Sequence, residues 1–307
     1  MFLNYLIQRL INAIFILFGV TTLVFLLIHL VPGDPVEVML GESARPADRA
    51  ALQAALGLDL PLFQQWLNFI KGVLFFDLGE SLHSRQSVSA ILSERIPATL
   101  LLSVSSLMVA VIIAFPLGML AAINKDSYWD RSAMVVAMLG VSIPNFVMGP
   151  LLMLIFALWL GWFPVNGNEG WLSLVLPSLT LGTALAAILS RMIRASMLEV
   201  LQEDYIRAAQ ARGLSKPIVY WRHALSNALL PIVTVLGLQF GALLAGAVIT
   251  ETIFSWPGVG QLLIESIQKR DYPIVQACVL LISATYVFVN LATDVCYTLI
   301  DPRVRLE

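Results

Sequence analysis

The chain has 307 residues; 59% are hydrophobic, only 12% are charged, and the formal net charge is −2. Soluble domains average about 45–50% apolar and about 25% charged residues, so the composition excludes an ordinary water-facing globule. We therefore expect an integral membrane protein surrounded by the lipid bilayer, and we expect no nucleic-acid partner.

The N-terminal run MFLNYLIQRLINAIFILFGV is mostly apolar and has no small-residue cleavage site behind it. This pattern predicts a retained membrane span over residues 11–31 and not a removable signal peptide, so residues 1–31 hold the N-terminus and the first transmembrane helix. Four further stretches can cross a bilayer as helices of about 20 residues. They cover residues 98–123, 171–190, 228–250 and 275–299.

A sixth apolar stretch, residues 132–162, is too long for one straight span and carries Pro144 and Pro150. It can form one kinked helix or a tight hairpin of two helices. The distribution of Lys and Arg decides between these, because short inner segments carry most of the basic residues of membrane proteins. A single span here, with the N-terminus inside, puts the following residues on the inner side: Arg9, Lys125, Arg131, Arg191, Arg194, Arg207, Arg212, Lys216, Arg222, Arg303 and Arg305.

The sequence therefore predicts an all-α membrane protein with six transmembrane helices. The last five form a core over residues 98–300, and the N-terminus and the tail at 301–307 are both cytoplasmic. Residues 32–97 are expected to form a small helical segment outside the membrane, on the periplasmic side. In that segment Gly57 is placed to end one short helix and Pro61 to begin a second one.

No side-chain cluster predicts catalysis or metal binding. The three histidines, His29, His83 and His223, lie in different segments, and no lysine completes the G-K-[ST] end of a phosphate-binding loop. We therefore expect no catalytic residue, no metal ligands and no ATP hydrolysis by this chain itself. Asp294 is the one ionisable residue well inside a predicted span; it is expected to pair with a basic residue or to line a wet cavity, and a role in a transport pathway stays open.

The inner loop at residues 191–227 contains the polar stretch EDYIRAAQARG. Asp204 is predicted to cap a short helix, Gly213 to end it in the left-handed C′ position, and Ser215 to start a second helix. Four residues of the short helix recur on one side: Tyr205, Ala208, Ala209 and Arg212. On these patterns alone, this helix either receives a partner protein on its alanine face or lies on the inner leaflet.

The same loop resembles the coupling loop of ABC-importer permeases, whose pattern begins with Glu-Ala-Ala, three residues and Gly. Ala208, Ala209 and Gly213 match this pattern, while Arg207 stands where the glutamate would be. The stretches EDYIRAAQARGL and RHALSNALLP are similar to the form found in the peptide/nickel permease subfamily. So are VPGDPV, DLGESLHSRQSV, ETIFSWPGVGQLL, RDYPIVQ and DPRVR, which follow in order along nearly the whole chain.

This resemblance implies the six-helix fold of a type I ABC importer permease in a bacterial inner membrane. It also implies a second permease subunit, two separate ATP-binding subunits that hold ATP and Mg, and a periplasmic solute-binding protein, with no cofactor bound by this chain. The residues that it implies for coupling to an ATP-binding subunit are Glu203, Asp204, Tyr205, Arg207, Ala208, Ala209, Arg212, Gly213 and Leu214.

The solute is less closely defined by the resemblance than the family is. Di- or oligopeptides come first, and nickel complexes or glutathione-like solutes stay open. A self-driven secondary transporter is the alternative function, although the predicted spans hold few of the ionisable groups that such transporters use as relays.

Overall fold

The computed structural model describes residues 2–30, 36, 45–55, 57–167 and 170–300. The predicted cytoplasmic tail at 301–307 and most of the VPGDPV stretch lie outside this part of the chain. Every regular secondary-structure element in these ranges is a helix. In chain order they are α1 (Phe2–Leu30), α3 (Pro46–Ala55), α4 (Leu62–Leu74), α5 (Val88–Ile123), α6 (Tyr128–Ser142), α7 (Asn145–Leu152), the π-helical segment η1 (Met153–Trp159), α8 (Leu172–Val200), α9 (Asp204–Ala211), α10 (Lys216–Ile218), the π-helical segment η2 (Val219–Ala224), α11 (Leu225–Gly246), α12 (Val248–Ile253), α13 (Val259–Lys269) and α14 (Tyr272–Ile300).

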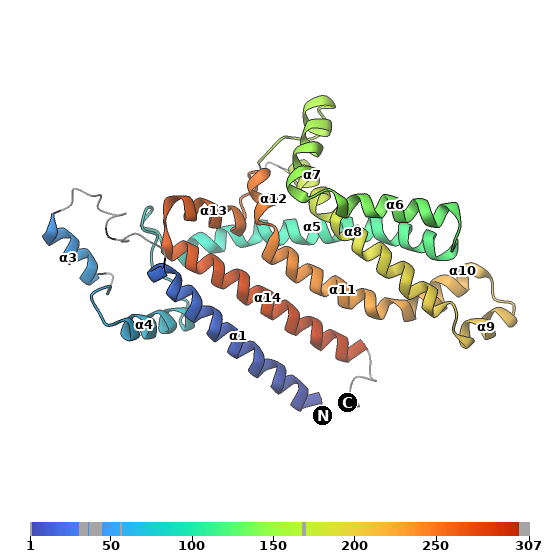
Figure 1. Cartoon of the computed structure of the whole chain (residues 1–307), viewed down its shortest axis with the longest axis horizontal. Coiled ribbons are helices and arrows are strands. Elements are labelled where there is room, and N and C mark those ends of the chain that lie inside the picture. Colours follow the sequence, from blue (N-terminus) through green and yellow to red (C-terminus); the bar gives the residue numbers. More distant parts are fainter. Residues whose placement is uncertain (1, 31–35, 37–44, 56, 168–169, 301–307) are drawn as a thin grey trace.

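Five helical stretches are long and apolar enough to cross a membrane, and they confirm the five predicted spans. They cover Ile7–Leu26, Val88–Ile123, Leu172–Val200, Lys216–Leu244 and Tyr272–Val295. These helices run roughly along the long axis of the molecule, with α9 at one end and α13 at the other (Figure 1). We name these two ends after the roles that the resemblance implies for them: the end with α9 is the coupling end, and the end with α13 is the outer end. The start of α1 and the end of α14 lie close together on the side away from α13 (Figure 1).

The helices α5 and α8 form the centre of the bundle and share its most extensive packing. Two glycines allow their close approach. A Cβ on Gly182 would lie 2.6 Å from Val109 Cγ1, and a Cβ on Gly118 would lie 2.7 Å from Ile193 Cβ. Small residues at such crossings let membrane helices pack closely without a hydrophobic driving force.

The sixth predicted span is bent by 100° between α6 and the helical run of α7 and η1. It is therefore neither a straight helix nor an antiparallel hairpin. The break falls at Ile143, which is extended, directly before Pro144. A residue that precedes proline is pushed away from the helical region, so the helix ends there. Figure 1 shows α7 standing out from the layer that α5, α6 and α8 form.

Several helices extend beyond the apolar stretches that predicted them. α5 begins at Val88 instead of residue 98 and includes Pro97, α8 continues from residue 190 to Val200, and the fifth span is helical from Lys216 onward. Hydropathy detects the part of a helix that is surrounded by lipid, whereas the backbone hydrogen bonds continue into the polar regions beyond it.

The segment before α5 contains the two predicted short helices. Gly57 has a φ of +66° after α3, and Pro61 occupies the N-cap position of α4, as predicted. α4 does not stand clear of the bundle, because it packs on α1. The rings of Phe18 and Trp66 are 5.8 Å apart, edge to face.

Candidate coupling site

The short polar helix of the inner loop is α9, and its start differs from the prediction. Glu203 occupies the N-cap position, with an extended backbone and no hydrogen bond from its side chain to the helix. Asp204 is the first helical residue and not the cap. Its exposed carboxylate accepts a hydrogen bond from Arg207 Nη1 at 3.2 Å. An acidic side chain in the first turn is still favourable, because the N-terminus of a helix carries partial positive charge.

The end of α9 confirms the predicted left-handed glycine. Gly213 has a φ of +80°. Its N–H donates to the carbonyl of Gln210 at 2.9 Å, and the N–H of Leu214 donates to the carbonyl of Ala209 at 3.4 Å. These two bonds form a Schellman motif, which satisfies the last carbonyls of the helix and turns the chain sharply.

Burial divides α9 into an inner and an outer face. Ile206 is 0% exposed and Ala209 is 8% exposed, and both belong to the central core cluster. Tyr205 is 41% exposed, and Ala208 and Arg212 are exposed as well. The predicted face of Tyr205, Ala208, Ala209 and Arg212 is therefore wrong in one member, because Ala209 points into the chain's own core.

Side-chain hydrogen bonds fix α9 to the start of the fifth span. Asn227 Nδ2 donates to the hydroxyl oxygen of Tyr205 at 2.7 Å and to the carbonyl of His223 at 3.1 Å. The predicted helix start at Ser215 is confirmed, since Ser215 is the N-cap of the helical run that begins at Lys216. The contribution of Ile206 and Asn227 was not predicted, although Ile206 is the one large aliphatic side chain in α9.

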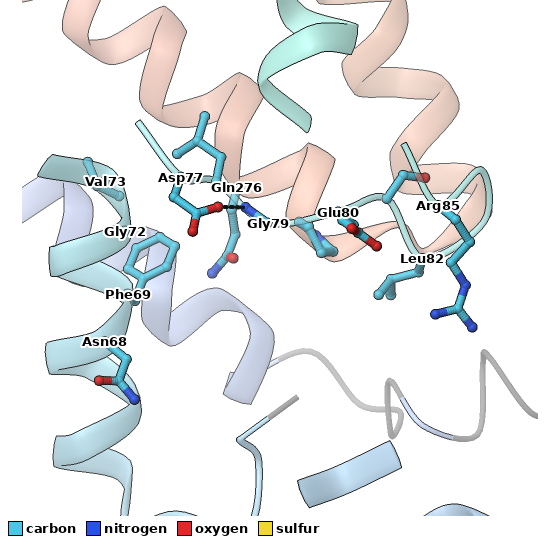
Figure 2. Close-up of a pocket in the computed structure, with 13 residues that line it drawn as sticks. Asn68, Phe69, Gly72, Val73, Asp77, Gly79, Glu80, Leu82, Arg85 and Gln276 are labelled. Carbon is cyan, nitrogen blue, oxygen red and sulfur yellow. Dashed lines mark hydrogen bonds between the residues drawn. The ribbon is translucent and has the colours of Figure 1, made fainter. Parts of the chain in front are cut away.

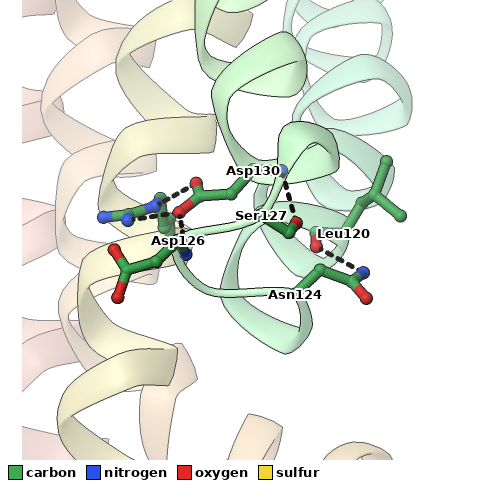
Figure 3. Close-up of polar contacts among 6 residues, drawn as sticks. Leu120, Asn124, Asp126, Ser127 and Asp130 are labelled. Carbon is green, nitrogen blue, oxygen red and sulfur yellow. Dashed lines mark hydrogen bonds and ion pairs between the residues drawn. The ribbon is translucent and has the colours of Figure 1, made fainter.

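A partly buried ion pair lies at the same end of the bundle and joins α6 to α8. Arg194 donates to both carboxylate oxygens of Asp130, at 2.6 Å through Nε and 2.7 Å through Nη2. The N–H of Asp126 also donates to Asp130, at 3.0 Å, so the carboxylate holds the turn between α5 and α6 (Figure 3). The two partners are 64 positions apart, which no local sequence pattern detects. Bidentate pairs of this kind are geometrically specific, so α6 and α8 are held in one orientation here.

Asp294 forms an ion pair with Arg9 of α1, with its Oδ2 3.1 Å from Nη1. Both side chains are partly exposed. This pair connects α1 to α14, the first and last helices of the chain.

The outer end is held together by two buried carboxylates. Glu251 accepts hydrogen bonds from the hydroxyl of Thr99 at 2.7 Å and from the N–H groups of Gly260 at 2.7 Å and Gln261 at 3.0 Å. Asp271 accepts from the hydroxyl of Ser81 and from the N–H of Leu82. Three of the motif stretches, DLGESLHSRQSV, ETIFSWPGVGQLL and RDYPIVQ, are packed together into one unit, because Val88, Val259 and Ile274 belong to one buried cluster, which sequence spacing does not reveal.

A pocket of about 400 Å³ lies beside this unit, between α4, the loop at residues 77–85 and the start of α14. Figure 2 shows Asn68 and Phe69 of α4 on one side of it and Gln276 behind, with the Asp77 carboxylate accepting from the N–H of Gly79 at 3.3 Å. No group of three or more His, Cys, Asp or Glu side chains is placed to hold a metal ion in the residues that the structure describes.

Comparison with known proteins places these features in a family. Residues 114–306 match the family model described as "Binding-protein-dependent transport system inner membrane component", and residues 2–103 match the N-terminal model of the same system. The chain is 43% identical over 305 residues to the glutathione transport system permease protein GsiC of Escherichia coli (strain K12), covering 99% of this chain and 100% of that protein. It is 45% identical, with the same coverage, to the protein of that name from Pectobacterium atrosepticum.

Solved structures show a similar fold at low sequence identity. An inward-facing structure of the MetNI methionine ABC transporter matches with a TM-score of 0.60 and 16% identity, covering 69% of this chain and 96% of that chain. A structure of an amino acid ABC transporter matches with a TM-score of 0.53 and 16% identity, covering 70% and 94%. These likenesses agree with the predicted fold of a type I ABC importer permease. With both family models and the full-length relatives in agreement, this chain belongs to the binding-protein-dependent transport system inner-membrane components, the permease subunits of ABC importers.

Proposed function

We propose that this permease imports short peptides, with glutathione-like tripeptides included, and that α9 transmits the motion of separate ATP-binding subunits to the membrane helices. The observation that carries the coupling role is the two-sided packing of α9. One face is buried in the core by Ile206 and Ala209, and the other face, with Tyr205 and Ala208, is open to a partner.

The coupling follows from what α9 touches on both of its faces. α9 follows α8 directly and packs on η2, and its Tyr205 is hydrogen-bonded to Asn227 at the start of α11. A partner bound to the exposed face of α9 can therefore displace α8 and α11 together. The ion pair of Asp130 and Arg194 extends this connection from α8 to α6. Packed interiors transmit such displacements because they deform little.

The energy is proposed to come from other chains. The sequence has no G-K-[ST] phosphate-binding motif, so two ATP-binding subunits would supply ATP and Mg. A second permease subunit would complete the pathway, and a periplasmic solute-binding protein would deliver the solute to the outer end. In this arrangement the coupling end and both termini are cytoplasmic.

Short peptides are favoured as the solute by the relatives. Several full-length relatives are named glutathione permeases, and glutathione is a tripeptide. Nickel complexes are less favoured, because the described residues contain no side-chain cluster suited to a metal ion.

Affinity purification of the tagged chain from its host membrane in mild detergent, followed by mass spectrometry, tests the assembly. We expect a second permease and ATP-binding subunits to be recovered with it. Proteoliposomes that hold this assembly and the matching binding protein should then take up glutathione, dialanine or trialanine only when ATP is present. Uptake by the purified chain without ATP would support a secondary transporter instead.

The variant pair Ala208→Glu and Ala209→Glu separates docking from folding. Ala208 is exposed, so its replacement should leave the thermal stability of the chain unchanged while it abolishes copurification of the ATP-binding subunits and uptake. Ala209 is buried, so a carboxylate there should destabilise the chain itself. Full uptake by the Ala208→Glu variant would contradict the proposed role of α9.

A further inference from the structure

One side of α4 carries an exposed apolar stripe. Phe63 is 66% exposed, Leu74 is 71% exposed, and Leu67 lies between them on the same side of the helix. At about 100° of rotation per residue, these three side chains fall within about 40° of one another. Phe75 and Phe76, each 82% exposed, follow directly after the helix. A contiguous apolar surface of this kind marks an interaction site and not a water-facing helix.

The neighbouring side of α4 is seated on a membrane span, and this sets its depth. The indole N–H of Trp66 donates to the hydroxyl of Thr22 at 3.3 Å, and the rings of Phe25 and Phe69 are 5.8 Å apart. The span of α1 covers Ile7–Leu26, so Thr22 and Phe25 belong to its outer half. The apolar stripe on α4 therefore lies at the level of the outer leaflet.

The polar residues of α4 are on a different side from the stripe. Gln64 and Asn68 lie about 60–140° further around the helix from its members, and Lys71 lies at the border, about 40° from Leu67. Asn68 lines the pocket shown in Figure 2, to which no residue of the stripe contributes. With 13 residues, α4 is about 20 Å long, whereas the hydrocarbon layer is about 30 Å thick, so α4 cannot cross it.

From this arrangement we propose that α4 is a partial-depth helix embedded in the outer leaflet, with Phe63, Leu67, Leu74, Phe75 and Phe76 against lipid acyl chains. An apolar side next to a polar side is the pattern of helices that lie at a membrane interface. The partner is lipid because the stripe adjoins a face of α1 that is itself within the bilayer. For α4 alone, this revises the expectation that residues 32–97 lie outside the membrane, and it does not depend on the identity of the solute.

Spin-label accessibility in bilayers tests the proposal. In a background with Cys278→Ala and Cys296→Ala, single cysteines replace Leu67 and Leu74 on the stripe, or Gln64 and Asn68 on the polar side as matched controls. The full chain, assembled with its copurifying subunits, is reconstituted in nanodiscs of phosphatidylcholine and phosphatidylglycerol. Collision of each label with oxygen, which concentrates in lipid, is compared with collision with a water-soluble nickel chelate.

We expect the ratio of oxygen to nickel collisions to be several-fold higher for the two stripe labels than for the two control labels. Equal ratios, with ready access to the nickel chelate at Leu74→Cys, would mean that the stripe faces water and would overturn the proposal. Immobile stripe labels shielded from both reagents would mean that a protein subunit covers the stripe, which would also overturn it.

Discussion

The end of α9 depends on one residue, and its replacement gives a sharp test of the coupling helix. Gly213 has a φ of +80°, and a Cβ at this position would meet no atom within 4 Å. Steric crowding is therefore absent, and only the backbone conformation opposes a side chain. Left-handed backbone costs an L-residue about 1–2 kcal/mol, and a β-branched residue resists it most strongly.

A Gly213→Val change should therefore destabilise the closed Schellman motif at the end of α9 by about 1–2 kcal/mol. The ratio of the closed motif to conformations in which it is open should fall by about 5- to 30-fold. The N–H groups of residues 213 and 214 lose their bonds to Gln210 and Ala209 when the end opens. Hydrogen–deuterium exchange of these two amides should accelerate by a similar factor, and uptake should fall.

Gly213→Asn is the matched control, because asparagine tolerates the left-handed conformation better than valine does. It should show a clearly smaller increase in exchange. Exchange of the Gly213→Val variant at the wild-type rate would refute the argument that the Schellman motif fixes the end of α9.

Three further changes test the packing that connects the two ends of the bundle. Gly182→Leu should destabilise the chain by about 1–3 kcal/mol or more by forcing α5 and α8 apart, whereas Gly19→Leu, where a Cβ meets nothing within 4 Å, should have little effect; equal melting temperatures in detergent would contradict this. Asp130→Ala should cost about 1.5–3 kcal/mol because the partly buried Arg194 loses its charged acceptor, and Asp130→Ala with Arg194→Leu should recover part of that loss; a double variant no more stable than the single one would contradict it. Glu251→Ala should cost about 3 kcal/mol or more, since several buried donors lose their acceptor, and thermal unfolding at the wild-type temperature would show that the carboxylate is not needed at the outer end.

The sequence was sufficient for those features that have a local cause. Apolar length predicted the spans, and the need for a residue with positive φ predicted Gly213 as the end of α9. The proline at position 144 marked the irregular span, but its 100° bend depends on how α7 packs beyond it. Boundaries such as the start of α5 at Val88 were missed because hydropathy does not report where a helix ends in polar surroundings.

The orientation of α9 could not be predicted, because periodicity groups residues on one side without saying which side is buried. Ala208 and Ala209 are equivalent in the sequence pattern, and only the packing of Ile206 and Ala209 in the core with residues of α8 and η2 distinguishes them. The contacts of the buried carboxylates could not be predicted from the sequence either. Glu251 and Thr99 are 152 positions apart, so their hydrogen bond depends on the tertiary fold.

Photo-cross-linking from the exposed face of α9 tests the central claim most directly. A benzophenone attached to an Ala208→Cys variant without other cysteines is irradiated in native membranes, with a label at Leu160→Cys, at the end of η1, as control. The account predicts that Ala208 forms an adduct with an ATP-binding subunit and that Leu160 does not. Adducts of Ala208 with lipid alone would mean that α9 lies on the inner leaflet, and the coupling role would then be wrong.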